Sequence, residues 1–145
     1  MTTISELYAP HHRRCDEEFA SAEAAAAEGQ WDKATEATTR FCAMLEAHLG
    51  SEEGTLFPAF EGATGMVGGP TAMMRMEHQQ MRGLLGQLER ACAGKDADAF
   101  AGAAETMLIL MQQHNMKEEN ILYPMCDNAV TGAEVLETIR TQLAK

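Results

Sequence analysis

Histidine and glutamate recur at one fixed interval along this chain of 145 residues. Three pairs of residues are each separated by 66 positions: His12 and His78, His48 and His114, and Glu52 and Glu118. Imidazole nitrogens and carboxylate oxygens are ligand atoms that iron and manganese accept in proteins. Two copies of one unit, each with a lone histidine and a His/Glu pair, would build a two-centred metal site about a pseudo-twofold axis.

The sequence around the two His/Glu pairs repeats as well. Residues 48–58 read His-x-x-x-Glu-Glu-x-x-Leu-Phe-Pro, and residues 114–124 read His-x-x-x-Glu-Glu-x-x-Leu-Tyr-Pro. Positions four apart lie on one face of an α-helix, about one turn from each other. In a helix, each pair would therefore present an imidazole beside a carboxylate.

Apolar residues at steps of three and four predict four long helices that would position these side chains. The expected segments run from about residue 5 to 28, from 31 or 32 to beyond 56, from 70 to 93, and from 98 to beyond 123. Short connections between the first and second helices, and between the third and fourth, favour antiparallel neighbours. The predicted fold is all-α: an up-down-up-down antiparallel four-helix bundle in a single domain, residues 1–145, with a short C-terminal helix (133–143) packed across one end.

Glycines and prolines mark the expected boundaries. The Gly-rich segment 61–69 should connect the second and third helices, and Gly29 lies where the first should end. Pro58 and Pro124 are expected to kink or close the helices in which they lie, because proline lacks a backbone N–H.

All six repeated residues lie on the apolar faces of the expected helices. An unpaired polar group inside a protein costs on the order of one to three kcal/mol, and an unpaired carboxylate costs more. A single histidine on an apolar face is more often hydrogen-bonded in the core, and a single His/Glu pair is often a solvated surface pair. Three equal offsets on core-facing stripes instead favour metal ions, which would satisfy all six groups at once.

Of the two adjacent histidines, His12 is the predicted ligand. His12 continues an apolar stripe at steps of three and seven, whereas His11 shares its face with Arg14 and Glu18. The interval of 66 residues also places Glu77, and not a histidine, opposite His11. We therefore expect His11 to face the solvent.

The types of ligand indicate the metal. Imidazole and carboxylate without thiolate favour iron or manganese over a structural zinc site. Two bridging glutamates and two histidines per ion would leave room for a bridging oxide or hydroxide and for an open position that a diatomic molecule could take. We expect two iron ions, with manganese or zinc as alternatives. Glu53 and Glu119 lie about 100° further round their helices; we expect them to be surface residues or hydrogen-bond partners of the ligands.

The composition restricts the classes of partner. A formal net charge of −11 argues against nucleic acid, whose phosphates an acidic chain would repel. No apolar run is long enough to span a membrane, and the N-terminus lacks the pattern of a signal peptide, so we expect a cytoplasmic protein. The four cysteines form no C-x-x-C pair, and we expect them to be reduced and mostly packed in the core.

The combination of motifs resembles the hemerythrin-like, or HHE cation-binding, family. The resemblance covers roughly residues 8–124 and rests on the lone histidines and on the two His-x-x-x-Glu units that end in Leu-[Phe/Tyr]-Pro. It implies a four-helix bundle around a non-haem di-iron centre, with the four histidines as terminal ligands and Glu52 and Glu118 as bridges. Members of the family are associated with reversible dioxygen binding, oxygen or redox sensing, iron handling, and repair of iron centres after nitrosative damage.

The ligand pattern departs from that of the oxygen carriers. Oxygen-carrying hemerythrins have five histidine ligands, two of them four apart on the third helix, and an aspartate on the last helix. Here Met74 and Arg82 stand four residues on either side of His78, and the last helix offers Glu118. One iron would thus lack a nitrogen ligand, which argues against a plain oxygen-carrier role.

Two residues one helical turn from His12 have alternative roles. Tyr8 could donate a hydrogen bond or bind as a phenolate, but we expect it at the rim of the bundle with its hydroxyl in water. Cys15 could be a redox-active thiol near the metal, but core packing is the favoured interpretation.

Three functions are compatible with the sequence. The first is a di-iron protein that binds or senses dioxygen, nitric oxide or redox state, without an organic substrate and not primarily an enzyme. The second is an iron-handling or redox enzyme that repairs iron centres or oxidises peroxide or ferrous iron. The third is a helical interaction module with a structural metal. We prefer the first, because an open coordination position in an apolar bundle suits a small diatomic ligand; a sensor would also need a protein partner, which the sequence does not name.

Overall fold

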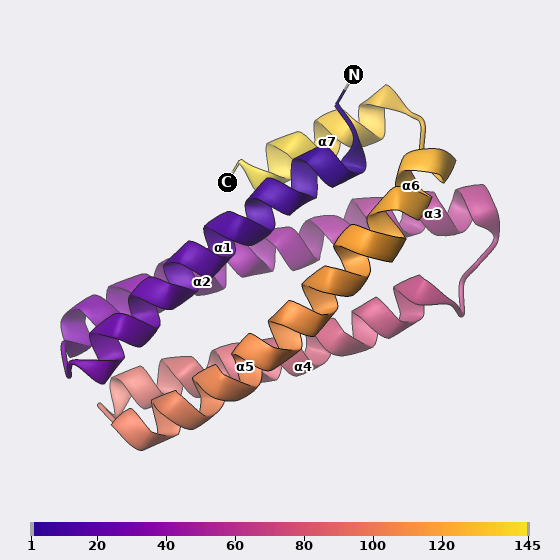
Figure 1. Ribbon diagram of the computed structural model, residues 1–145. Helices are drawn as coiled ribbons and strands as arrows, with labels where there is room; N and C mark the ends of the chain where they lie inside the picture. The colour runs from indigo at the N-terminus through magenta and orange to yellow at the C-terminus, as the bar shows by residue number, and fades with distance from the viewer. Residues whose placement is uncertain (1, 145) are drawn as a thin grey trace.

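The computed structural model describes residues 2–144, and this part of the chain is helical with short connections (Figure 1). The α-helices are α1 (Ile4–Ala27), α2 (Trp31–Ser51), α3 (Phe57–Thr64), α4 (Pro70–Ala93), α5 (Ala97–Lys117), α6 (Tyr123–Ala129) and α7 (Ala133–Leu143). Two π-helical segments, η1 (Glu52–Leu56) and η2 (Glu118–Leu122), join α2 to α3 and α5 to α6. The all-α prediction is confirmed.

The long helices pack as a bundle. Helices α1 and α2 lie side by side and are joined by a short turn, as are α4 and α5 (Figure 1). Helix α2 also packs on α4, and α1 on α5, so that the two pairs enclose a common core. A capping box begins α1: the Thr3 side chain accepts from the Glu6 amide, and the Glu6 carboxylate accepts from the Thr3 amide.

The prolines do not close their helices. Each lies at the start of a new α-helical segment, Pro58 in α3 and Pro124 in α6, directly after a π-helical segment. There the amide of Phe57 donates to the carbonyl of Glu52, and that of Tyr123 to Glu118. A π turn is wider than an α turn, which keeps the carbonyl of the preceding turn away from the proline ring. The helix therefore continues through both prolines.

The connection between α3 and α4 is shorter than expected. Helix α3 extends to Thr64 and ends at Gly65, which has a φ of +76°. Glycine adopts this left-handed conformation at little cost and commonly ends helices in this way. Only residues 65–69 remain as a connection.

The C-terminal helix has the predicted bounds, but it lies along α1, α2 and η1 and not across an end of the bundle (Figure 1). Ile139 and Leu143 are its buried residues, and the Thr55 hydroxyl of η1 donates to the Gln142 side chain at 3.1 Å. In the described part of the chain, no helix has the length and apolar character needed to cross a membrane.

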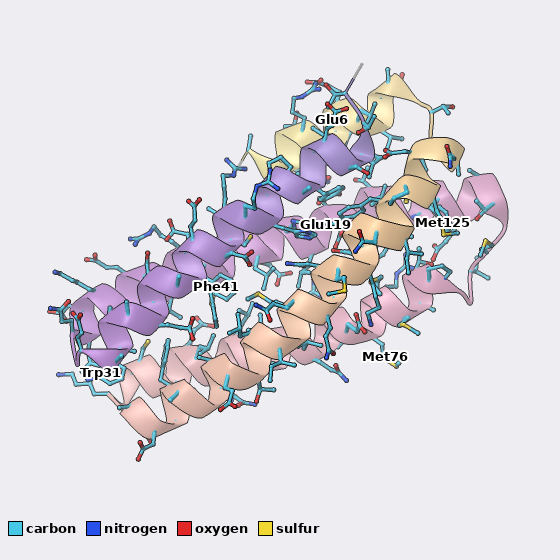
Figure 2. The ribbon with its side chains drawn as sticks, in the orientation of Figure 1. Glu6, Trp31, Phe41, Met76, Glu119 and Met125 are labelled. Carbon is cyan, nitrogen blue, oxygen red and sulfur yellow. The ribbon has the colours of Figure 1, made fainter. Side chains whose placement is uncertain are left out.

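Two apolar clusters form the core. One occupies the part of the bundle where α1 turns into α2 and includes Phe19, Phe41 and Met107; Figure 2 labels Phe41 there. The other is built around α3, α6 and α7 and includes Phe57 and Tyr123. Along each long helix, the repeated histidines and glutamates fall between residues of the two clusters. Apolar packing thus surrounds one polar layer.

Candidate metal centre

The six repeated residues meet inside the bundle. They come from six elements: His12 from α1, His48 from α2, Glu52 from η1, His78 from α4, His114 from α5 and Glu118 from η2. Each is buried, with an exposed fraction of 3% or less. The predicted convergence is therefore present, and both glutamates sit at the first position of a π-helical segment. Such segments are frequent at functional sites, because they change the direction of a side chain without ending the helix.

One group of donor atoms lies on the side of His78 and His114. It consists of Glu52 Oε1, His78 Nε2, His114 Nε2 and Glu118 Oε2, which we call the His78/His114 position. These four residues offer ligand atoms that lie within 4.8 Å of one another. None of the four atoms has a hydrogen-bond partner among the described residues, although His78 Nε2 is 3.1 Å from Glu52 Oε1 and His114 Nε2 is 3.3 Å from Glu118 Oε2. Buried polar atoms without a hydrogen bond lower the stability of the folded state, and a shared cation would satisfy all four.

A second group lies on the side of His12 and His48, the His12/His48 position. Ligand atoms of His12, His48 and Glu118 lie within 4.8 Å of one another, and His12 Nε2 is 3.0 Å from Glu118 Oε1. His48 Nε2 is 3.6 Å from Glu52 Oε2. Each glutamate thus turns one oxygen toward each position. Carboxylates so placed can bridge two cations, and the residues present fit a pair of metal ions.

Carboxylates support the outer nitrogens of three histidines. His12 Nδ1 is 2.7 Å from Glu119, His78 Nδ1 is 2.8 Å from Glu53, and His114 Nδ1 is 2.6 Å from Glu77. When Nδ1–H donates to a carboxylate, the lone pair of Nε2 faces inward and is free to bind a cation. Glu119, labelled in Figure 2, lies on η2 near α1. Glu53 and Glu119 are hydrogen-bond partners of the histidines, one of the two roles expected for them; Glu77 has the same role, which the sequence did not indicate.

His11 supports the fourth histidine, and the prediction that it faces the solvent is wrong. Its exposed fraction is 2%, and its Nδ1 lies 2.9 Å from His48 Nδ1. The interval of 66 residues relates His11 to Glu77 and His48 to His114, so the repeat includes these outer partners. The prediction considered one apolar stripe on α1, but α1 packs against both α2 and α5. The side toward α2 is therefore buried as well.

Basic residues pair with two of the outer carboxylates. Arg82 holds Glu53 with two hydrogen bonds of 2.8 and 2.9 Å, and Lys117 pairs with Glu77. Burial raises the pKa of Glu53, but the hydrogen bonds from Arg82 and His78 outweigh this effect and lower it below its usual value. Both carboxylates therefore stay ionised and can accept from the imidazoles.

The inner carboxylates make the polar layer attractive to cations. Burial lowers the pKa of His48 and of His114, but the charges and hydrogen bonds of nearby carboxylates, chiefly Glu52 and Glu118, raise each to about 9. Burial raises the pKa of Glu118, whereas hydrogen bonds and the neighbouring histidines lower it well below its usual value. Protons and metal ions therefore compete for the same nitrogens.

Two buried tyrosines lie beside the polar layer, and Tyr8 differs from expectation. Tyr8 is fully buried and not at the rim: its hydroxyl is 2.9 Å from Ser51 Oγ, and its ring stacks on Tyr123. The Tyr123 hydroxyl lies 2.7 Å from Glu52 Oε2 and 2.9 Å from Glu118 Oε1. We did not select Tyr123 from the sequence, although the Phe/Tyr difference in the repeat marks it. Burial raises the pKa of Tyr123 well above its usual value, as do the charges of Glu118 and Glu52.

The cysteines of the described chain are free, and Cys15 packs in the core as expected. Burial raises the pKa of Cys15 to about 12, which keeps it a thiol. Its sulfur is 3.8 Å from His11 Nδ1. A thiol of this kind contributes packing, because the thiolate is the reactive form.

Comparison with known proteins agrees with this geometry. A model of the hemerythrin HHE cation-binding domain matches residues 3–126. Searches of curated proteins and of solved structures found no match to the chain. The matched segment contains the six converging residues and both tyrosines, and it ends within α6, so that all of α7 lies outside it. This chain belongs to the hemerythrin HHE cation-binding domain family.

Proposed function

We propose that the protein binds two iron ions with His12, His48, Glu52, His78, His114 and Glu118, and that it binds or senses dioxygen, nitric oxide or redox state at this carboxylate-bridged pair. In this proposal the four long helices form an up-down-up-down antiparallel bundle around the two iron ions. The proposal rests on four buried ligand atoms that have no hydrogen-bond partner in the described chain. These atoms are Glu52 Oε1, His78 Nε2, His114 Nε2 and Glu118 Oε2.

The chain's own residues would perform three tasks. The outer carboxylates fix the tautomers of the histidines and turn their Nε2 atoms inward. Glu52 and Glu118, both fully buried, supply the negative charge that draws cations into an apolar interior. The two apolar clusters pack on either side of the polar layer and shield it from solvent. Iron, when bound, supplies a redox-active centre to which a diatomic molecule can coordinate.

The test is a spectroscopic experiment on protein purified without oxygen. We expect about two irons per chain, set by the two donor groups, and a change in the visible spectrum on exposure to dioxygen or nitric oxide. The variant Glu118→Gln should lose iron and the spectral change, while Glu105→Gln, at an exposed position of α5, should keep both. An iron-loaded, reduced protein whose spectrum is unaffected by either gas would contradict the proposal.

A redox enzyme or iron-handling protein is the second candidate, and Tyr123 favours it. Its neutral hydroxyl donates a hydrogen bond inside the polar layer, and in an enzyme the same group would donate to a bound peroxide. An enzyme should consume ferrous iron or peroxide over many turnovers, whereas a binding protein should react once per site. Counting turnovers per chain distinguishes the two.

A further inference from the structure

The two halves of the repeat differ at the residue that follows each π-helical segment. Phe57 and Tyr123 are 66 residues apart, both are fully buried, and each begins the α-helix after a π-helical segment. The Phe57 ring stacks on His78 with centroids 5.6 Å apart and an interplanar angle of 24°. The Tyr123 ring stacks on His12 at 5.7 Å and 24°. The rings are therefore equivalent in placement, and the hydroxyl is the chemical difference between them.

That hydroxyl lies within hydrogen-bond distance of the inward-facing atoms of one position. Tyr123 Oη is 2.7 Å from Glu52 Oε2, 2.9 Å from Glu118 Oε1, and 3.2 Å from the Nε2 atoms of both His12 and His48. These are the inward atoms of the His12/His48 position. The corresponding four atoms of the His78/His114 position have no hydrogen-bond partner in the described chain. The phenol oxygen thus stands among the atoms that a cation would need to reach.

Packing prevents the hydroxyl from moving far. The Tyr123 ring stacks on Tyr8 at 5.0 Å with an interplanar angle of 19° and is shielded from solvent. Its backbone amide, directly after η2, donates to the carbonyl of Glu118, the first residue of η2. A cation entering between His12 and His48 must break the hydrogen bonds of Tyr123 while the ring stays in place. At the His78/His114 position the equivalent residue is Phe57, which has no hydroxyl. A cation that enters there has no hydrogen bond of this kind to break.

We propose that Tyr123 makes the two cation positions unequal: its hydroxyl competes for the His12/His48 donors, so that a first cation binds at the His78/His114 position and a second binds more weakly at the other. This inference rests on the cation site of the proposed function and assigns to Tyr123 the order in which the site fills. Tyr123 is a specificity-determining residue in this sense.

Calorimetric titration of the metal-free, full-length protein with Zn²⁺ tests this order without any redox chemistry. We expect two steps for the wild type, the first at least about tenfold tighter than the second, equal to about 1.4 kcal/mol. Tyr123→Phe removes the competing hydroxyl, so the affinities of its two steps should converge to within about threefold. The matched change in the other half, Phe57→Tyr, should weaken the first step by about tenfold or more.

Three results would overturn the inference: two equal steps in the wild type, an unchanged ratio in Tyr123→Phe, or a second step that becomes weaker in Tyr123→Phe. The last result would make the hydroxyl a ligand and not a competitor. Should Tyr123→Phe fail to fold by circular dichroism, Phe57→Tyr decides alone, since an unchanged first step contradicts the inference. Failure to bind Zn²⁺ at all would contradict the cation site itself, whereas equal binding of two ions contradicts only the order.

Discussion

The Nδ1 atoms of His11 and His48 lie 2.9 Å apart inside the bundle, and both side chains are buried. A hydrogen bond between them requires that one nitrogen carries the proton and the other accepts it. Burial and the nearby His48 lower the pKa of His11 to about 3, so His11 stays neutral and can accept. His48 then donates from Nδ1, and its Nε2 faces the position that a cation would take. His11 is therefore a positioning residue for His48.

Replacement of His11 by alanine tests this role. We expect a loss of about 1–3 kcal/mol in the free energy of unfolding of the metal-free protein, because His48 Nδ1 loses its buried partner. The second step of Zn²⁺ binding should weaken by about 10- to 100-fold, the usual effect of removing a hydrogen-bond partner of a ligand. Urea denaturation and calorimetry measure both quantities. Arg13→Ala, at an exposed position of the same helix, is the control, and an equal effect of both changes would contradict the assignment.

The stability of the metal-free protein should depend on pH in a defined direction. The pKa values of His48 and His114 are raised to about 9 in the fold, above the ordinary value of 6.5. Their contribution is thus fully present below pH 6.5 and is lost as the pH rises through about 9. We expect the melting temperature of the metal-free protein to fall across this window. A melting temperature that rises between these values would show that the two imidazoles are not held in protonated form.

Metal binding should show the opposite dependence on pH. Because a cation needs deprotonated imidazoles, its affinity should increase as the pH rises toward 9, and binding near pH 7 should release protons. Calorimetry in buffers of different ionisation enthalpy counts the released protons. Binding without proton release would mean that His48 and His114 are already neutral, contrary to their surroundings.

Removal of the metal should destabilise the fold. A cation present at about 100 times its dissociation constant stabilises the folded state by about 2.7 kcal/mol per site. Addition of a chelator should therefore lower the melting temperature of the loaded wild type by several degrees. The variant Glu118→Gln should respond much less, because it lacks one of the two carboxylates that face both positions. Equal responses of the two proteins would indicate that the metal binds elsewhere.

Asp127 connects the end of α6 to the start of α1. Its carboxylate accepts from the Ile4 amide at 2.7 Å and from the Ser5 hydroxyl at 2.6 Å, close to the positive end of the helix dipole. Asp127→Asn should lower the free energy of unfolding by about 0.5–2 kcal/mol. Denaturant unfolding beside Glu36→Gln, an exposed control on α2, measures the difference. No difference between the two variants would show that the connection contributes nothing to stability.

The sequence predicted the helices and the converging side chains for simple physical reasons. Apolar residues at helical spacing determine which faces meet, and a side chain on that face must point into the core. The equal intervals then indicated that His12 and His78, and the two His/Glu pairs, occupy one layer. Metal binding by these residues remains a prediction.

The sequence did not predict the remaining features, because they depend on contacts between helices. The apolar face of one helix does not show these contacts. His11 is buried because α1 has two neighbours, so a second side of the helix is covered. The π-helical segments occur where a glutamate must reach the core six residues before a proline. Helix propensity does not report such local widening. Tyr123 belongs to the repeated motif, but only the placement of its ring shows that its hydroxyl reaches four donor atoms.

Anomalous diffraction at the iron edge, from crystals of protein loaded with ferrous iron without oxygen, tests the central claim most directly. We predict two peaks inside the bundle, one among Glu52, His78, His114 and Glu118 and the other beside His12 and His48, with both glutamates contacting both peaks. A difference map without a peak among these side chains, or with iron only at surface carboxylates, would contradict the account.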